Sequence, residues 1–242
     1  MTRDDLPTVG AITYKTFAED ELFAWLSPKQ HLYPDDVRRS QLLRLRKRLV
    51  NVGSHGIVMV TEKTDSGWTG NAEVVGFAFS CRTGDDAASH KWKTDSIANK
   101  LERYLLGWEL LYESKVLNRA SDSKRMEAYA KIAQYDFYEK LDPRWHLAMF
   151  GVSPKHQRRG IGGMLVKHCQ ILAKEEDVPI TLESSVVGRH LYLKLGFKIV
   201  DEIEIVEGLD SIAMVWEPSH LEGKWLEDNG GGKTHVKGRF AK

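Results

Sequence analysis

Cysteine is scarce in this sequence, which holds two among 242 residues. Cys81 and Cys169 lie far apart, and neither has a companion at the spacing of a metal-binding pair. A disulfide framework or a zinc site needs several such ligands in register, so both are disfavoured, and no metal is expected. We expect the two thiols to be packing groups in a protein of a reducing compartment.

Long apolar runs are also missing, since no stretch approaches the roughly 18 residues that a membrane-spanning helix needs. The first ten residues, MTRDDLPTVG, carry two adjacent acids where a secretory signal carries bases. The sequence therefore predicts neither a membrane partner nor export, and we expect a cytoplasmic location.

An excess of one charge sign is missing as well. Lys and Arg number 35 and Asp and Glu number 34, which leaves a formal net charge of +1. Such a balance provides no long-range field to attract nucleic acid, so no nucleic-acid partner is expected. Any binding of phosphate must then depend on local features.

The spacing of apolar residues changes along the chain between the periods typical of helices and of strands. Helices are predicted over about 4–17, 35–51, 95–117, 122–140, 160–176 and 188–196. Strands are predicted over about 56–63, 72–81, 145–152, 178–184, 197–206 and 211–218, the first two as an antiparallel hairpin. This order predicts one α/β domain over 1–218, followed by a C-terminal tail over 219–242 that we expect to be partly mobile.

A helical insertion at about 82–142 interrupts the predicted sheet and is rich in aromatic residues. One interpretation is an extra packing layer. The other is a cap over a substrate pocket, because pockets are commonly lined by aromatic side chains with a few polar groups. The two interpretations are compatible.

The stretch SPKHQRRGIGGMLVKHC places glycines and arginines directly before a predicted helix. The first amides of a helix lack acceptors and lie at the positive end of its dipole, so they bind anions such as phosphate. Gly160, Gly162 and Gly163 would let the backbone approach a bulky diphosphate, and Arg158 and Arg159 would add local charge. The spacing fits neither the P-loop nor the dinucleotide-binding fingerprint.

Two motifs together resemble the GNAT superfamily of acyl-CoA-dependent N-acetyltransferases. VSPKHQRRGIGGMLV is similar to the pyrophosphate-binding motif of that superfamily, and LYLKLGF is similar to its later helix-to-strand motif. The sequence of these motifs is most similar to the branch of puromycin acetyltransferase-like and fungal proteins. The resemblance covers residues 145–205 firmly and leaves out the insertion and the tail. It implies a mixed, mainly antiparallel twisted sheet flanked by helices, with the insertion before the cofactor-binding strand.

The resemblance also implies acetyl-CoA as a cosubstrate. The residues that it places at the cofactor are Phe150, Gly151, Val152, Gln157, Arg158, Arg159, Gly160, Ile161, Gly162, Gly163, Ser185 and Tyr192. In particular, the backbone of Phe150 and Val152 would pair with the pantetheine arm, and Tyr192 would protonate the departing thiolate. The alternative for Tyr192 is a buried packing residue. The family's first strand would precede the first helix, and it is either lost here or lies before the sequence begins.

The base that removes the amine proton is not fixed by the motifs. Glu183, at the end of a predicted strand, is the first candidate, with a structural hydrogen-bonding role as its alternative. His146 is the second candidate, and a water chain to a residue of the insertion is the third. The family's frequent acid on the strand at 145–152 is replaced by Ala148 or an apolar neighbour.

These features predict an N-acetyltransferase that moves an acetyl group from acetyl-CoA to the amine of a small molecule by direct attack in a ternary complex. One alternative acceptor is the N-terminus or a lysine of a peptide or protein. A second alternative, outside enzymes, is a catalytically weak acyl-CoA-binding protein. The sequence leaves the identity of the amine and the oligomeric state open.

Overall fold

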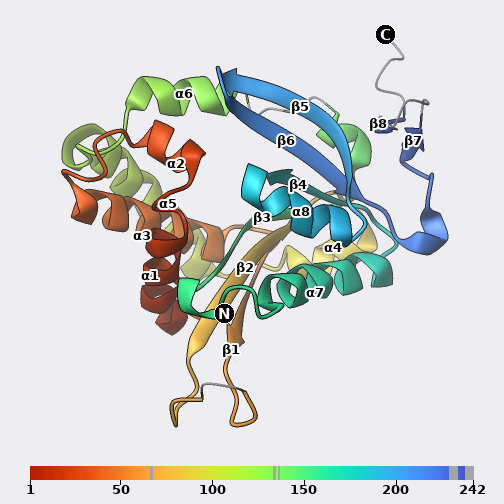
Figure 1. Cartoon of the computed structure of the whole chain (residues 1–242), viewed down its shortest axis with the longest axis horizontal. Coiled ribbons are helices and arrows are strands. Elements are labelled where there is room, and N and C mark those ends of the chain that lie inside the picture. Colours follow the sequence, from red (N-terminus) through yellow and green to blue (C-terminus); the bar gives the residue numbers. More distant parts are fainter. Residues whose placement is uncertain (66–67, 133–134, 136, 229–233, 238–242) are drawn as a thin grey trace.

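A six-stranded sheet forms the centre of the protein in the computed structural model, which describes residues 1–65, 68–132, 135, 137–228 and 234–237. Its strands are β1 (Ser54–Val60), β2 (Val74–Arg82), β3 (Trp145–Val152), β4 (Ile180–Ser184), β5 (Lys198–Val206) and β6 (Leu209–Trp216). They lie in the order β1-β2-β3-β4-β6-β5, and all neighbours are antiparallel except β3 and β4. Figure 1 shows the sheet twisting between helices. The predicted fold class is confirmed.

The parallel strands β3 and β4 are neighbours only at their beginnings. Two residue pairs join them, Trp145 with Ile180 and His146 with Thr181. The pairing of β3 with β2 also shifts by one residue just beyond this point, opposite Phe79 and Ser80. A bulge of this kind bends a strand. The later part of β3 therefore has no β4 residue paired along that edge.

Helices cover both faces of the sheet because successive side chains of each strand point in opposite directions. On one face, α7 (Ile161–Glu175) and α8 (Val186–Lys194) cover the largest core cluster, which includes Trp145 and Leu182. On the other face, α1 (Leu6–Thr16) and α3 (Pro34–Val50) cover a second cluster. The short helix α2 (Glu21–Leu26) lies between α1 and α3 in the chain. At the edge of the sheet, the amino group of Met1 donates to the Gly56 carbonyl at 3.0 Å.

The predicted helical insertion connects β2 to β3. Its elements are α4 (Ala87–Trp92), α5 (Ile97–Tyr112), the π-helix η2 (Glu113–Leu117), α6 (Ser123–Ile132) and the 3-10 helix η3 (Tyr138–Leu141). Buried Leu106 of α5 packs on Leu43 and Val50 of α3. In addition, buried Asp36 of α3 accepts from Arg119 of the insertion at 2.9 Å, and the indole nitrogen of Trp92 on α4 donates to Glu176, just beyond the end of α7, at 2.7 Å. The insertion is thus anchored to both faces of the sheet.

The helix predicted over 122–140 is too long. α6 ends at Ile132, and Phe137 and Tyr135 are buried against β5 and β6 instead of continuing a helix. The Tyr135 hydroxyl donates to the Ser211 hydroxyl at 2.7 Å. Residues 133, 134 and 136 lie outside the described part of the chain.

Part of the C-terminal tail packs on the main sheet where the structure describes it. A 3-10 helix η5 (Ser219–Leu221) precedes a small sheet of β7 (Leu226–Asp228) and β8 (Thr234–Val236). Leu226 and Val236 are buried against the main sheet, and the Glu217 carboxylate accepts from the Trp225 amide at 2.7 Å. These contacts attach the described part of the tail to the main sheet. The glycine triplet itself and residues 238–242 lie outside the described residues.

Candidate active site

The loop before α7, residues 157–163, has the backbone of an anion-binding turn and is called the glycine loop below. It follows β3 and the 3-10 helix η4 (Pro154–His156). Gly160 is the N-cap of α7 and has a φ of +83°. Arg158 has a φ of +63°, which is uncommon for a residue with a side chain. Alternation of left- and right-handed residues turns successive amides toward one point and makes a concave anion site.

Three amides of this loop have no acceptor within the described structure. The first helical hydrogen bond of α7 runs from the Met164 amide to the Gly160 carbonyl at 3.1 Å, which leaves the amides of Ile161, Gly162 and Gly163 free. A side chain at Gly162 would lie within 3.3 Å of Leu191 on α8 and 3.4 Å of Phe150 on β3. Glycine thus lets the loop lie close to both elements.

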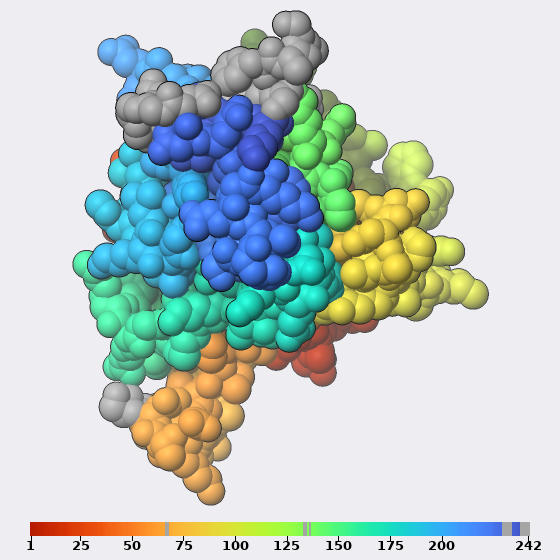
Figure 2. Space-filling view, turned by 90° about the vertical axis from the view of Figure 1, so that its right-hand side faces the viewer, coloured from red at the N-terminus to blue at the C-terminus, as the bar shows by residue number. Residues whose placement is uncertain are grey.

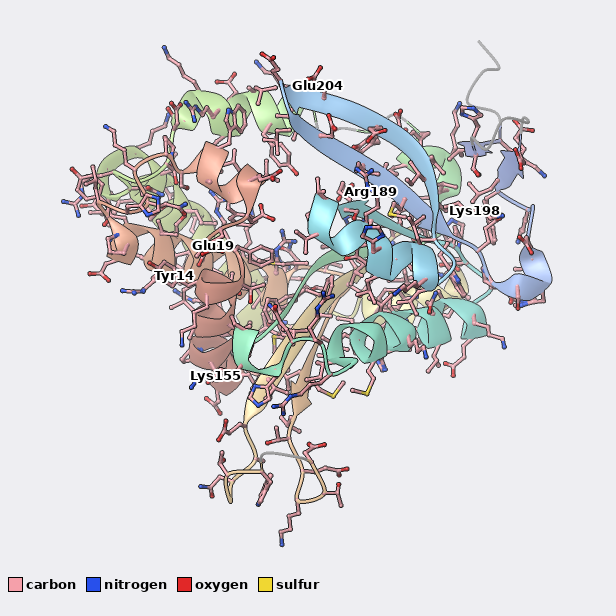
Figure 3. All side chains as sticks on the ribbon, in the orientation of Figure 1. Tyr14, Glu19, Lys155, Arg189, Lys198 and Glu204 are labelled. Atoms are coloured by element: carbon pink, nitrogen blue, oxygen red, sulfur yellow. The ribbon has the colours of Figure 1, made fainter. Side chains whose placement is uncertain are left out.

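The basic residues around the loop are exposed. Arg158 and Arg159 both lie at the surface, and Figure 3 places Lys155 at the outer side of the loop. Such charges raise the local concentration of an anion without needing a basic protein. The loop therefore combines free amides, a helix N-terminus and local positive charge.

The end of β3 lies directly beside the glycine loop. Phe150, Gly151 and Val152 pair with β2 on one side, and their other side faces the opening between β3 and β4. The Val152 carbonyl already accepts from the side chains of Gln157 and Thr16, each at 3.2 Å. Gln157 consequently uses its side chain to hold the loop onto the strand.

Tyr192 of α8 lies between the same strand and the core. Its side chain is buried, with ring centroids 5.9 Å from Phe150 and 5.5 Å from Phe197. No hydrogen bond to its hydroxyl is present among the residues described. Burial raises the pKa of Tyr192 above its usual value, and negative charge at Glu183 raises it further. The phenol therefore keeps its proton at neutral pH.

Ser185 lies at the start of α8, two residues beyond Glu183. Its hydroxyl oxygen accepts from the Gly188 amide at 3.2 Å and caps the helix. The hydroxyl proton remains available for another acceptor. This cap also explains why α8 begins at Val186, slightly before the predicted helix at 188–196.

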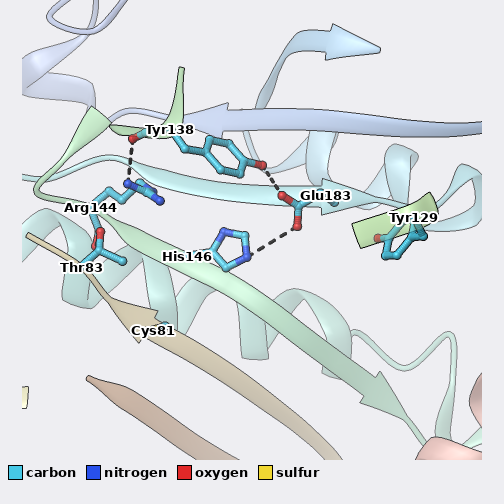
Figure 4. Close-up of a pocket in the computed structure, with 7 residues that line it drawn as sticks. All are labelled: Cys81, Thr83, Tyr129, Tyr138, Arg144, His146 and Glu183. Carbon is cyan, nitrogen blue, oxygen red and sulfur yellow. Dashed lines mark hydrogen bonds and ion pairs between the residues drawn. The ribbon is translucent and has the colours of Figure 1, made fainter. Parts of the chain in front are cut away.

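A cavity of about 300 Å³ lies on the opposite face of the sheet, and it is called the central cavity below (Figure 4). His146 and Glu183 reach it because they alternate along β3 and β4 with Trp145 and Leu182, which are buried under α7. The residues that line it are Cys81, Thr83, Tyr129, Tyr138, Arg144, His146 and Glu183. Both base candidates of the sequence are thus in one cavity.

Glu183 is the centre of a hydrogen-bonded group in this cavity. The Tyr138 hydroxyl donates to one carboxylate oxygen of Glu183, and His146 Nε2 lies 3.5 Å from the other. His146 Nδ1 lies 3.0 Å from the Thr181 hydroxyl on the adjacent strand. The carboxylate is thereby held between the insertion and the parallel strand pair, with part of its surface still exposed.

The burial of this group affects its proton affinities. Burial lowers the pKa of His146 below its usual value, although the Glu183 carboxylate acts in the opposite direction. Burial and the nearby Glu183 charge raise the pKa of Tyr138 and bring that of Tyr129 to about 12. At neutral pH the cavity therefore contains a neutral imidazole and two protonated phenols.

The sequence did not single out Tyr138 and Tyr129. Both belong to the insertion: Tyr138 on η3 contacts Glu183 across 45 residues of chain, and Tyr129 on α6 lines the same cavity. The aromatic content of the insertion was the only signal for them. The position of the two tyrosines agrees with the interpretation of the insertion as a cap over a pocket. The packing of the insertion on α3 agrees with its interpretation as an extra packing layer.

Metal binding and membrane spanning can both be examined in the structure. Within the part of the chain that the structure describes, there is no group of three or more His, Cys, Asp or Glu side chains arranged to hold a metal ion. Of the helices described, none is both long and apolar enough to cross a membrane.

Comparison with known proteins shows which proteins this chain is similar to. Residues 141–218, which contain β3, the glycine loop, Glu183 and Tyr192, match the model of the acetyltransferase (GNAT) domain family. An acetyltransferase from Stachybotrys chartarum is 22% identical over 207 residues, covering 86% of this chain and 82% of the relative. The solved structure of a histone acetyltransferase HPA2 and related acetyltransferase from Corynebacterium glutamicum superposes with a TM-score of 0.56 at 20% identity, covering 90% of this chain and 94% of the other.

Proposed function

Because the chain belongs to the GNAT superfamily, whose enzymes transfer acetyl groups from acetyl-CoA, we propose that it acetylates the amine of a small molecule held in the central cavity. The observation that carries this proposal is the position of Glu183. It lies on β4 at the cavity, near the point where β3 and β4 separate, while the glycine loop and Tyr192 lie on the other face. Donor and acceptor would then meet through the opening between the strands.

The donor side uses mainly backbone groups. The free amides of Ile161, Gly162 and Gly163, with Arg158 and Arg159, would hold the diphosphate of acetyl-CoA. The pantetheine arm would then extend along the unpaired edge at Phe150 to Val152, where backbone groups can hydrogen-bond to its amides. The Ser185 hydroxyl would donate to the same arm from the start of α8.

On the acceptor side, a proton must be removed from the amine before it reacts. An alkylamine with a pKa near ~10.4 is almost wholly protonated at neutral pH, so it needs a base before it can attack. Glu183 would accept this proton, with Tyr138 and His146 fixing the orientation of the carboxylate. Because His146 is neutral, it can also take the proton onward to solvent.

The transfer itself then proceeds in one ternary complex. The neutral amine nitrogen attacks the thioester carbonyl and the carbon–sulfur bond breaks. The nitrogen gives its second proton to Glu183, which has passed the first one on through His146, so a neutral amide forms, and Tyr192 regains a proton from solvent after each turnover. Tyr192 would give its proton to the departing thiolate, since its raised pKa keeps the phenol protonated. A thiolate of pKa about 8.5 also leaves without much help, so this proton adds to the rate and is not essential.

The size of the central cavity supports a small acceptor. Its volume of about 300 Å³ is at the lower end of the range for small-molecule sites. Tyr129 and Tyr138 of the insertion form part of its lining. An extended peptide would need a longer groove than this.

Two measurements test the proposal in order. Acetyl-CoA at about 100 times its Kd should raise the melting temperature by roughly 5 to 10 °C. Release of CoA thiol should then be followed with small primary amines and with short peptides at equal concentration. Turnover of small amines is expected, and turnover of peptides alone would contradict the acceptor class. A melting shift without turnover of either would favour an acyl-CoA-binding protein.

A further inference from the structure

The insertion helix α5 exposes a continuous apolar face, which we call the apolar stripe. Its members are Ile97, Leu101, Tyr104, Leu105, Trp108, Leu111, Tyr112 and, on η2, Val116. Every one of them is largely exposed, from 48% for Leu111 to 85% for Ile97. Figure 2 shows the yellow-green residues of this part of the chain at one edge of the molecule. Large apolar side chains rarely collect on a solvent-facing helix.

The stripe is a second apolar face, in addition to the one that attaches α5 to the protein. Leu106 is fully buried against α3, and Leu110 packs beside it on the same side. The stripe lies on the opposite side of the helix, with Ile97, Leu101, Tyr104, Trp108 and Leu111 following at alternating spacings of four and three residues. This spacing forms the seam along which two helices pack together. The fold therefore uses one side of α5 and leaves the seam without a partner among the described residues.

The area of the stripe matches what a stable complex needs. With large apolar side chains of roughly 150–250 Å², the exposed fractions amount to on the order of 1,000 Å². The largest apolar patch on a typical monomer measures about 300–600 Å². A standard interface buries about 800 Å² on each partner. The stripe alone is therefore large enough to form one side of such an interface.

The charged residues of α5 favour a partner whose surface is as apolar as the stripe. Glu102 and Glu109 are engaged within the chain by Arg3 and Arg46, and Arg103 is paired with Asp95. A helix that binds an anionic membrane usually carries many Lys and Arg on its polar face, whereas α5 offers mainly Lys100. The stripe itself contains no charged side chain between Ile97 and Tyr112. Such a surface is complementary to itself.

From these observations we infer that the protein forms a two-fold symmetric dimer, in which the apolar stripes of two copies pack against each other as antiparallel helices. A two-fold axis across the seam brings the same patch of each chain together and closes the assembly at two copies. The interface would lie on the outer side of the insertion. The glycine loop and the central cavity would remain open to their ligands in both copies.

Sedimentation of the purified chain tests this inference directly. An interface of this size gives dissociation constants of micromolar or below, so at about 50 μM the chain should sediment with twice its 27.5 kDa mass. Trp108→Glu and Leu101→Glu should each give monomers at that concentration, because a charge in the seam loses its hydration on packing. The matched control is Ile171→Glu on α7, which alters a side chain of similar exposure, 55%, outside the stripe, and should remain dimeric.

Two results would overturn the inference. One is a wild-type chain that stays monomeric at about 50 μM, well above the dissociation constants expected for such an interface. The other is a dimer that persists in both Trp108→Glu and Leu101→Glu with an unchanged melting temperature, which would put the interface elsewhere. In the first case, cosedimentation with phosphatidylcholine–phosphatidylserine vesicles, lost in Trp108→Glu, would assign the stripe to a lipid surface instead.

Discussion

The two faces of the sheet present functional groups of different kinds. On the α7 face, the candidate donor site consists of backbone amides and of glycines that allow close approach, all within a few residues of one another in the chain. On the other face, the central cavity consists of side chains from β3, β4 and the insertion. A site made of backbone tolerates changes of most side chains, whereas a site made of side chains depends on each of them. The two faces should therefore respond differently to substitution.

The largest effect is expected at Glu183. Glu183→Gln removes the proposed base and keeps the side-chain shape, so kcat/KM should fall by about 10²- to 10⁴-fold. The affinity for acetyl-CoA, measured by calorimetry, should stay within about twofold, since the donor face is unchanged. Glu204→Gln is the control, because Glu204 is exposed, does not line the cavity and lies near one end of β5 (Figure 3). Equal loss of acetyl-CoA affinity in Glu183→Gln would contradict the separation of the faces.

The next largest effect is expected at Gly160. Gly160→Val should weaken acetyl-CoA binding by tenfold or more, about 1.4 kcal/mol, because a side chain strains the left-handed backbone that directs the amides. Gly208→Val is a matched control, since Gly208 has a φ of +81° and, as at Gly160, a Cβ there would meet no other atom within 4 Å. Both variants should lose a similar 1 to 2 kcal/mol of folding stability, roughly, from the strained backbone. A loss of affinity in both would indicate general damage.

A smaller effect is expected from Tyr192→Phe. The ring contacts with Phe150 and Phe197 are kept, so the melting temperature should change little. If Tyr192 protonates the thiolate, kcat should fall by about tenfold, and less with acyl donors whose thiol has a lower pKa. A lower melting temperature with unchanged kcat would instead assign Tyr192 to packing.

The smallest effect concerns pH and His146. Burial favours the neutral imidazole in the folded protein, so its pKa lies below that of the unfolded chain. The unfolded state then binds the proton first, and stability is lost as pH falls below about 6.5. The melting temperature should decline less between pH 7 and pH 5 in His146→Asn than in the wild type. An equal decline in the two proteins would show that His146 does not contribute.

The features that could be predicted from the sequence are those determined by residues close together in the chain. The glycine loop, the helix after it and the strand before it are set by residues within one turn of each other. The cap of α8 at Ser185 is equally local, but the helix predicted at 188–196 missed it. Tyr138 could not be assigned in this way, because its contact with Glu183 depends on how the insertion folds back over the sheet. The burial of Val236 in the tail could not be predicted either, because it depends on contacts with the main sheet and not on the residues next to it in the sequence.

The ends of the insertion are adjacent in space. Arg82 ends β2 and Trp145 begins β3, and the two residues are paired in the sheet, as they would be across a short hairpin turn. A connection of any length that starts and ends at such a pair leaves the strand register unchanged, and lengthening it adds only slowly to the entropy of closing the loop. Evolution can therefore exchange this segment as a module. Replacing Tyr129, Tyr138 and their supporting helices would then change the lining of the central cavity and leave the proposed acetyl-CoA site as it is.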